Sequence, residues 1–387
     1  MLSTKIEQLL GGISAQQFLD EYWQQKPLLV RQAFSELDTL ISPEELAGLS
    51  CDSDAPARII VEKGLQTAWQ SLYSPFDDQT FASLPETHWT LLVNDVERYY
   101  PELRDQIIEA FRFLPDWRID DLMISFAVEG GSVGPHTDEY DVFLIQAQGQ
   151  RHWQIADYAT DDSDLVAGID LRILKQIIPE QEWTLNVGDM LYLPPNVIHN
   201  GVALNDCMTI SVGFRAPQQQ SLLGHYFDRC LERSENTPRY RDPKRKLQAH
   251  SGEIDQQSVA ELMQLLRSGV DDSAYFMEQC IGQYLTEVKG DASSLNERVD
   301  TTDYCTEQSY QRSPASRFAY IVYTDKINFF ANGTSKIYSV NFIESAKFLC
   351  KHYYYDSSQL YLKMKDSEFA DCFNDLLRNN TIYSATG

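Results

Sequence analysis

The chain has 387 residues, of which 43% are hydrophobic, so it can bury substantial cores and is too long for one ordinary domain. Its formal net charge of −25 argues against stable direct nucleic-acid binding and would attract a basic protein partner, but the charge by itself favours the simpler explanation of solubility alone. Seven cysteines without C-x-x-C spacing, and no apolar run long enough to span a membrane, predict a cytoplasmic protein with reduced thiols and no membrane partner.

The N-terminal part of the chain predicts helices alternating with short strands. Residues 14–22 have the apolar spacing of a helix, and the apolar run after Pro27 is typical of a strand. Ser42 is expected to begin a second helix, because proline follows it directly and Glu45 stands three residues on. The next predicted elements are strands at 58–63 and 91–96 and an amphipathic helix at 99–113.

Residues 117–214 predict a different architecture, in which short apolar strands are separated by turns. Strands at such spacing favour a closed or double-sheet all-β body, a fold that often carries a site in the mouth of its barrel. The predicted strands are 122–128, 142–146, 152–155, 183–185, 190–193 and 208–214, with a further strand starting at His199.

After Pro217 the pattern becomes helical. Ser258 and Glu261 have the spacing of a capping box, which predicts the start of a helix. The basic run at 239–246 is expected to be a solvated loop, with a partner or RNA contact as the alternative. Helices are predicted at 221–231, 258–267 and 274–288.

The last part of the chain predicts a small α+β segment behind a linker. The polar residues 289–316 are typical of a linker. Asn332-Gly333 predicts the turn of a β-hairpin, because both residues accept the positive φ that such a turn needs. Around it we expect a strand at 318–323 and helices at 343–352 and 367–379.

A metal site is predicted from two motifs. In the extended segment after a glycine-rich turn, the side chains of His136 and Asp138 point to the same face. Their Cα atoms are about 6–7 Å apart, so both side chains can bind one ion. A lone H-x-D triplet also occurs by chance, but a G-x5-P-x-N-x2-H run from Gly188 to His199 matches the second metal motif of cupin barrels, with Asn where Gly is usual. Two histidines and a carboxylate suit non-haem Fe(II) oxygenases, and zinc sites use the same set.

If the metal is Fe(II), three protein ligands leave positions that a chelating 2-oxo acid and O₂ would fill. The far carboxylate of 2-oxoglutarate then needs a cation inside the barrel. Arg151 is the candidate, because it starts a strand two residues after Gly149 and its planar guanidinium binds a carboxylate with two hydrogen bonds; a surface arginine is the alternative. Ser125 and Ser211 lie in apolar strands, and either hydroxyl would complete the shell around that carboxylate.

Several segments together resemble the JmjC-type, cupin-like 2-oxoglutarate oxygenases, and within them the bacterial ribosomal oxygenases. The resemblance is dense from about residue 17 to 217 and weak after 300. The segments are W-x2-K-P-L from Trp23, P-H-x-D from Pro135, Y-D-V-F from Tyr140, G-Q-R-H-W from Gly149, L-P-P-x3-H from Leu193 and, for the narrower group, 117–126 and 211–217.

This resemblance implies a mixed α+β chain of three parts. The expected parts are a double-stranded β-helix (jelly-roll, cupin) catalytic domain at 1–217, a helical dimerisation region at 218–295 and a small winged-helix-like domain at 300–387. The activity it implies is hydroxylation of an arginine in large-subunit ribosomal protein sixteen by a homodimer. That partner is basic, which agrees with the acidic charge of this chain.

Carried over residue by residue, the resemblance also assigns the site. His136, Asp138 and His199 match the family's iron ligands, Arg151 matches its 2-oxoglutarate anchor, and Ser125 falls at a further cosubstrate contact.

An arginine substrate would need an acidic partner and an aromatic face. Asp121, at the mouth of its strand, and Tyr140, two residues past a metal ligand, are the candidates; the alternatives are that Asp121 caps a turn and Tyr140 packs. Two other functions stay open. One is hydroxylation of a histidine or another side chain, and the other is a non-catalytic, metal-binding cupin scaffold that docks on ribosomes.

Overall fold

The structure, a computed structural model, describes residues 2–34, 37, 41–52, 54–63, 69–233, 238–243, 245–247, 252–270, 273–288 and 304–385. The chain forms two compact units, Met1–Ala216 and Pro217–Gly387. The three-part division drawn from the resemblance stays a prediction. Residues 289–303 of the expected linker and Lys244 of the basic run lie outside the described residues.

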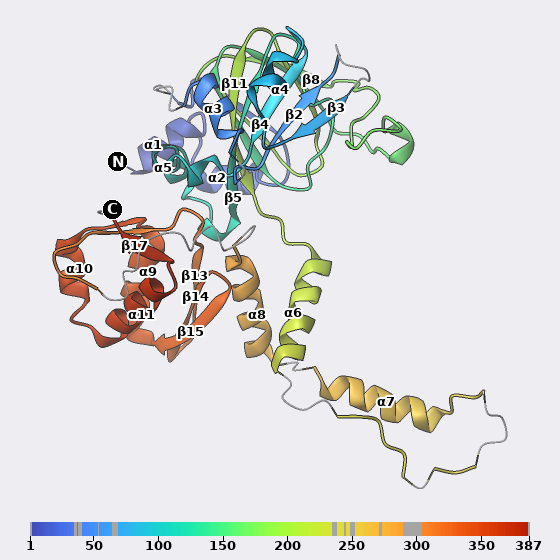
Figure 1. The fold of residues 1–387 in the computed structure, drawn as a ribbon, viewed down its shortest axis with the longest axis vertical. Helices are drawn as coiled ribbons and strands as arrows, with labels where there is room; N and C mark the ends of the chain where they lie inside the picture. Colours follow the sequence, from blue (N-terminus) through green and yellow to red (C-terminus); the bar gives the residue numbers. More distant parts are fainter. Residues whose placement is uncertain are drawn as a thin grey trace. The chain divides into compact units, whose positions relative to one another are not determined.

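A large antiparallel sheet forms the body of the first unit (Figure 1). Every residue of its strand β11 is buried, because β11 pairs with β6 on one side and β5 on the other and both of its faces are covered. Among the described residues the sheet has eight strands, in the order β1 (Leu28–Val30), β9 (Met190–Leu193), β6 (Val142–Gln148), β11 (Cys207–Phe214), β5 (Ile119–Ala127), β4 (Trp89–Val93), β2 (Ala57–Val61) and β3 (Gln70–Tyr73).

A smaller sheet packs against one face of the large one. Its strands are β10 (Ile198–Ala203), β7 (Arg151–Ala156) and β8 (Gln181–Leu185), in that order. Leu144 of β6 and Leu191 of β9 belong to the same apolar cluster as Ile155 of β7, so the core lies between the two sheets. The predicted double-stranded β-helix is therefore confirmed.

Both N-terminal helix starts that the sequence predicts are confirmed. The Ser14 side chain accepts a hydrogen bond from the Gln17 N–H at the start of α2, and Ser42 and Glu45 form a reciprocal capping box at α3. The helices of this unit are α1 (Leu2–Leu9), α2 (Ala15–Glu21), α3 (Pro43–Leu49), α4 (Asp78–Ala82) and α5 (Pro101–Ile107), with 3₁₀ turns at Val96–Arg98, Ile108–Phe111, Asp116–Arg118 and Asp162–Asp164.

Aromatic packing holds these helices on the outer face of the large sheet. The ring of Phe18, fully buried on α2, lies 5.0 Å from the ring of Tyr192 on β9 and 5.8 Å from that of Phe143 on β6. The helix expected at 99–113 is shorter than predicted. It ends at Ile107, and the last turn tightens to 3₁₀ geometry, a common way for a helix to end.

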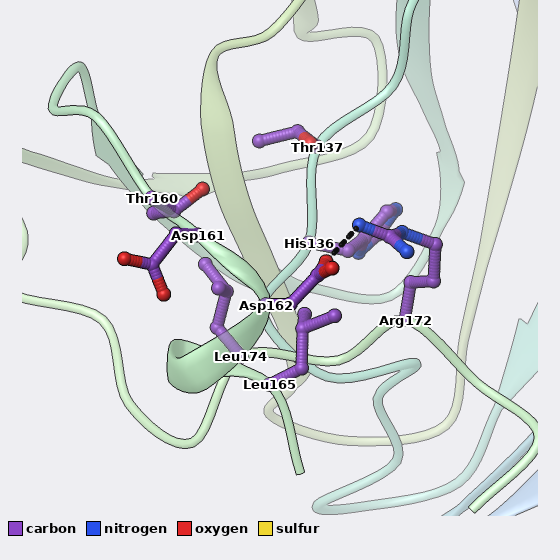
Figure 2. A pocket seen from close by; sticks show the side chains of 8 residues that line it. All are labelled: His136, Thr137, Thr160, Asp161, Asp162, Leu165, Arg172 and Leu174. Carbon is purple, nitrogen blue, oxygen red and sulfur yellow. Dashed lines mark hydrogen bonds and ion pairs between the residues drawn. The ribbon is translucent and has the colours of Figure 1, made fainter. Parts of the chain in front are cut away.

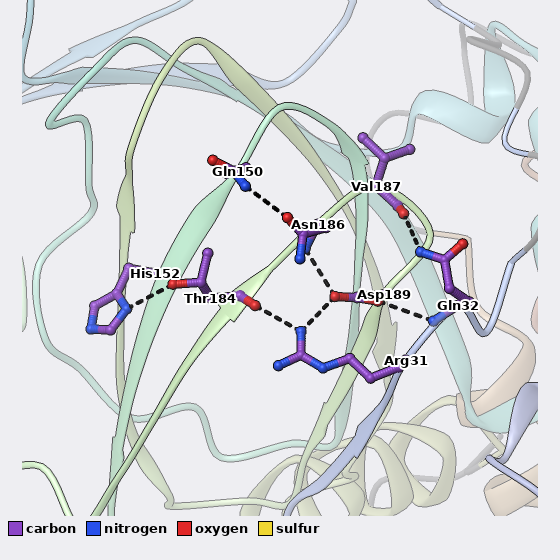
Figure 3. A network of polar contacts seen from close by, with 8 residues as sticks. All are labelled: Arg31, Gln32, Gln150, His152, Thr184, Asn186, Val187 and Asp189. Carbon is purple, nitrogen blue, oxygen red and sulfur yellow. Dashed lines mark hydrogen bonds and ion pairs between the residues drawn. The ribbon is translucent and has the colours of Figure 1, made fainter.

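The turn at Gly188-Asp189 is fastened to the N-terminal strand by one buried carboxylate (Figure 3). Asp189 accepts hydrogen bonds from the backbone N–H of Gln32 at 3.0 Å and of Asn186 at 2.9 Å, and from Nη1 of Arg31 at 2.6 Å. Gly188 has φ +89°, and a Cβ there would lie 2.5 Å from a backbone oxygen, so the turn requires glycine. The N-terminal segment thereby closes the edge beside β9.

Helices α6 (Gln219–Arg233), α7 (Gln256–Ser268) and α8 (Ala274–Thr286) begin the second unit. The predicted capping box at Ser258 is wrong. Asp255 is the N-cap, and its carboxylate accepts the Ser258 N–H at 2.7 Å, so the helix begins one turn earlier. α6 and α8 pack together through Cys230, Phe276 and Cys280 (Figure 1). In the described ranges no helix combines the length and the apolar character needed to cross a membrane.

The C-terminal part is a small α+β body. The hairpin at Asn332-Gly333 is confirmed, with φ of +48° and +76° at the two turn residues. The linker prediction is wrong at Tyr310–Arg312, which forms a strand. Local sequence does not indicate this strand, because the segments that pair with it lie far along the chain. The elements are β12 (Tyr310–Arg312), β13 (Phe318–Val322), β14 (Lys326–Ala331), β15 (Thr334–Ser339), α9 (Ile343–Lys351), β16 (Tyr354–Tyr355), α10 (Ser357–Lys363), α11 (Ser367–Arg378) and β17 (Ile382–Ser384).

Candidate active site

Backbone hydrogen bonds bring the two predicted metal motifs together. The N–H of His136 donates to the carbonyl of His199 at 3.0 Å, and the N–H of His199 donates back to the carbonyl of His136 at 2.9 Å. The N–H of Asn196 donates to the carbonyl of Asp138 at 2.7 Å. The loop after β5 is thus fixed, residue against residue, to the start of β10, although the two motifs are distant in sequence.

The three side chains converge on one point. One ligand atom from each of His136, Asp138 and His199 lies within 4.8 Å of the other two. Nε2 of His199 is 3.6 Å from Oδ2 of Asp138, and Nε2 of His136 is 3.9 Å from the same oxygen. Among the described residues, these three form the one cluster of His, Cys, Asp or Glu side chains that could hold a metal ion together.

The hydrogen bonds of both imidazoles leave the correct nitrogen free for a metal. Nδ1 of His136 donates to the Gly134 carbonyl at 2.8 Å, and Nδ1 of His199 donates to the Val197 carbonyl at 2.9 Å. A carbonyl only accepts, so the proton sits on Nδ1 and the Nε2 lone pair faces Asp138. Burial, followed by repulsion from His136, lowers the pKa of His199 to about 4, which keeps its ring neutral. The donor set therefore fits a divalent metal ion.

All eight residues predicted for the site line a single cavity, with an empty volume of about 770 Å³. Its lining also includes residues that the sequence argument did not assign, among them Arg58, Asn94, Trp153 and Thr209. The predicted residues in the lining are Asp121, Ser125, His136, Asp138, Tyr140, Arg151, His199 and Ser211.

Strand alternation could have found two of the unassigned residues. Trp153 stands two positions after Arg151, and Thr209 two positions before Ser211, so each pair points to one face of its strand. Arg58 and Asn94 carry no comparable signal, because they come from β2 and from the end of β4, outside both motifs.

Arg151 has the geometry of a carboxylate anchor. Its side chain is buried, and Nη1 donates to Oγ of Ser125 at 3.3 Å. Within the described residues, Nε and Nη2 are buried and have no hydrogen-bond partner. A buried guanidinium with two free donors is costly unless an anion binds it, so this end of the cavity fits a carboxylate.

The mouth of the cavity holds Asp121 and Tyr140. Oδ2 of Asp121 accepts a hydrogen bond from Nδ2 of Asn94 at 3.0 Å, and Tyr140 is 42% exposed. Partial burial, followed by repulsion from Asp138 and Asp121, raises the pKa of Tyr140, so its hydroxyl stays protonated. A carboxylate and an aromatic ring thus line the same cavity as the three converging side chains.

A second hollow shares His136 with the main cavity (Figure 2). Its empty volume is about 430 Å³, and it opens beside the 3₁₀ turn Asp162–Asp164. Arg172 and Asp162 form an ion pair at its rim, with Nη2 and Oδ1 3.1 Å apart. Both of these side chains are largely exposed, so the hollow is a surface feature beside the metal site.

Comparison with known proteins agrees with this architecture. Residues 106–222 match the JmjC domain, the segment that contains the three converging side chains and Arg151. The fold and the site together define a JmjC-type protein with a cupin-like barrel.

The chain is 36% identical over 272 residues to the ribosomal protein uL16 3-hydroxylase of Escherichia coli, covering 70% of each sequence. It is 37% identical over 214 residues to a probable ribosomal oxygenase of Haemophilus influenzae, covering 54% of this chain and 52% of that one. The chain therefore belongs to the JmjC ribosomal oxygenase family.

Solved structures extend the likeness over nearly the whole chain. The structure matches that of YcfD from E. coli with a TM-score of 0.79 and 28% identity, covering 96% of this chain and 98% of YcfD. A second structure of YcfD, described as a ribosomal oxygenase in complex with cobalt and 2-oxoglutarate, matches with a TM-score of 0.76.

Proposed function

We propose that the chain is an Fe(II)- and 2-oxoglutarate-dependent hydroxylase that modifies an arginine side chain of large-subunit ribosomal protein sixteen, uL16. The observation that carries the proposal is the convergence of His136, Asp138 and His199 within 4.8 Å in the cavity that also buries Arg151. The relationship to the E. coli uL16 3-hydroxylase supports the substrate protein.

The choice of iron follows from the donor set and the cosubstrate site. Zinc sites also use two histidines and a carboxylate, but a buried arginine with free donors beside them fits a 2-oxo acid oxygenase better. The 2-oxoglutarate and cobalt bound in YcfD support this choice. When bound with O₂ and 2-oxoglutarate, Fe(II) supplies the oxidation that hydroxylates a C–H bond and releases succinate and CO₂.

The chain's own residues position the reactants. His136, Asp138 and His199 would hold the metal, and Arg151 with Ser125 would bind the far carboxylate of 2-oxoglutarate at the closed end of the cavity. Ser211 lines the same cavity and would add a hydroxyl to that carboxylate's surroundings. The apolar walls from Val142 and Leu144 exclude water from the reacting atoms.

A substrate guanidinium would be held at the mouth. The Asp121 carboxylate, held by Asn94, supplies the opposite charge, and the Tyr140 ring supplies an aromatic face. The net charge of −25 attracts a basic ribosomal protein from a distance. This combination favours arginine over histidine as the modified residue.

The second unit is proposed to join two copies of the chain. α6 exposes Leu223, Phe227 and Leu231, and α7 exposes Met263 and Leu266, a set of apolar side chains that a second copy would cover. The expected assembly is a homodimer acting on its ribosomal substrate in the cytoplasm. Light scattering after size exclusion tests the dimer, and a monomer at micromolar concentration would contradict it.

Mixing the protein with Fe(II), 2-oxoglutarate and a uL16 peptide tests the function. We expect succinate release that depends on the peptide and a product heavier by one oxygen, which fragmentation mass spectrometry maps to an arginine. Oxygen mapped to a histidine would support the alternative substrate class. Metal binding without any succinate release would support the scaffold.

A further inference from the structure

Trp153 lines the cavity but has no role in the proposed function. Its side chain is 5% exposed and lines the cavity. Within the described residues, its indole Nε1 is buried and has no hydrogen-bond partner. A buried N–H without an acceptor is destabilising, so an unpaired one beside a ligand cavity indicates that a ligand supplies the acceptor.

The unpartnered N–H of Trp153 lies next to those of Arg151. The two residues are separated by one position on β7, so both side chains point into the space between the sheets. The guanidinium carbon lies 5.9 Å from the centre of the indole ring. Together they offer three buried N–H-bearing atoms without a protein acceptor, Nε and Nη2 of Arg151 and Nε1 of Trp153.

The opposite strand makes room for the indole. Gly201 of β10 pairs with Trp153, and a Cβ at position 201 would lie 2.8 Å from the six-membered part of the ring. On the metal side, the centre of the His199 ring is 6.1 Å from that of Trp153. The indole therefore lies beside both the metal ligand His199 and the guanidinium of Arg151.

We propose that Trp153 is a cosubstrate-specificity residue, whose indole N–H donates a hydrogen bond to the far carboxylate of the 2-oxo dicarboxylate that Arg151 binds. The inference rests on the proposed function, because it takes 2-oxoglutarate as the ligand. It adds a neutral donor to a cationic one. A 2-oxo acid that lacks the second carboxylate leaves both without an acceptor, so the pair selects for dicarboxylates.

Indole NMR signals test the hydrogen bond directly. The chain has 6 tryptophans, so ¹⁵N labelling gives one indole N–H signal for each, and the signal lost in Trp153→Phe belongs to Trp153. With Zn(II) in the site to prevent turnover, we expect 2-oxoglutarate to move that signal downfield. 2-Oxopentanoate, which has the same chain without the second carboxylate, should leave it nearly unmoved.

Calorimetry on the same zinc-loaded proteins gives the second readout. We expect Trp153→Phe to raise the Kd for 2-oxoglutarate about ten- to a hundredfold and to leave the Kd for 2-oxopentanoate unchanged. Trp183→Phe is the matched control, because Trp183 faces Trp153 across the β7–β8 pair and does not line the cavity. That variant should bind both acids like the unaltered protein.

The results distinguish a failure of the Trp153 inference from a failure of the proposed function. If the unaltered protein binds 2-oxoglutarate and the Trp153 signal and affinity do not change as expected, the inference is wrong and the proposed function stands. If the unaltered protein binds neither acid, the proposed cosubstrate is wrong, and the inference is wrong too because it assumes that cosubstrate.

Discussion

The side-chain amide of Asn94 donates to Oδ2 of Asp121 at 3.0 Å, across the gap between the end of β4 and the start of β5. The bond fixes the orientation of the Asp121 carboxylate, and both residues line the cavity. Asn94 thus positions the Asp121 carboxylate, which is the proposed partner of a substrate guanidinium.

Replacing Asn94 with alanine tests this relationship. We expect the KM for a uL16 peptide to rise about tenfold in Asn94→Ala, and further in Asp121→Ala, because hydrogen bonds to charged groups contribute about 1.5–3 kcal/mol. The Kd for 2-oxoglutarate should stay unchanged in both, since Arg151 lies at the other end. Equal losses of peptide and 2-oxoglutarate binding would instead show a general distortion of the barrel.

Glu97 makes the stability of the first unit depend on pH. Its carboxyl is buried and accepts the Leu122 N–H at 3.0 Å. Burial, followed by repulsion from Asp95 and Asp121, raises the pKa of Glu97 to about 8. Because the pKa of Glu97 is raised in the folded state, the stability that its protonated form contributes is fully present below the unfolded pKa of about 4.3. That stability is lost as the pH rises from there through the folded pKa of about 8, by up to about 1.4 kcal/mol per pH unit.

Glu97→Gln removes this dependence, because glutamine stays neutral and its carbonyl can still accept the Leu122 N–H. We expect the variant to match the unaltered protein at pH 5 and to melt several degrees higher at pH 8. Thermal unfolding at both pH values measures the difference. A constant gap between the two proteins across that range would show that Glu97 is ionised in the fold.

The buried carboxylate of Asp189 is expected to be a large contributor to stability. Asp189→Ala leaves the N–H groups of Gln32 and Asn186 without their acceptor, so we expect a loss of about 2–4 kcal/mol in the free energy of unfolding. Asp162→Ala is the control, since that side chain is 87% exposed, and surface changes usually stay within about 0.5 kcal/mol. A similar loss in both variants would remove the special role of the turn.

The Asp189 contribution also has a definite pH window. Burial alone would raise the pKa of Asp189, but the Asn186 and Gln32 N–H groups and Arg31 outweigh it, so the pKa is lowered. A lowered folded pKa gives stability that is present above the unfolded value of about 3.9 and is lost as pH falls below it. The difference between Asp189→Ala and the unaltered protein should therefore shrink in acid.

Local sequence was enough for the elements whose causes are local. The capping box at Ser42, the Asn332-Gly333 turn and the H-x-D spacing each depend on a few neighbouring residues, and each appears as predicted. Tyr310–Arg312 was missed, because its pairing partners at 354–355 and 382–384 lie far along the chain. Asn94 was missed for the same reason, since only the folded sheet brings it to Asp121.

Metal binding should depend on the buried histidine of the second motif. His199→Ala removes an Nε2 ligand that the Val197 carbonyl orients, so we expect loss of stoichiometric Co(II) binding, measured by visible absorption and calorimetry. His152→Ala is a matched control, because His152 also lies in the small sheet but contacts Thr184 and not the cavity. Unchanged metal content in the His199 variant would end the assignment of the site.

The guanidinium of Arg151 should matter for its shape as well as its charge. Arg151→Lys keeps the charge but replaces a planar fork with one point of contact, so we expect the Kd for 2-oxoglutarate to rise about tenfold; Arg151→Ala should raise it a hundredfold or more. Co(II) affinity should change in neither variant, because Arg151 is not among the three converging ligands. Calorimetry with metal and then 2-oxoglutarate measures both affinities in one sample. Equal 2-oxoglutarate binding by the lysine variant would show that charge alone anchors the carboxylate, and weakened metal binding would show that the arginine shapes the whole site.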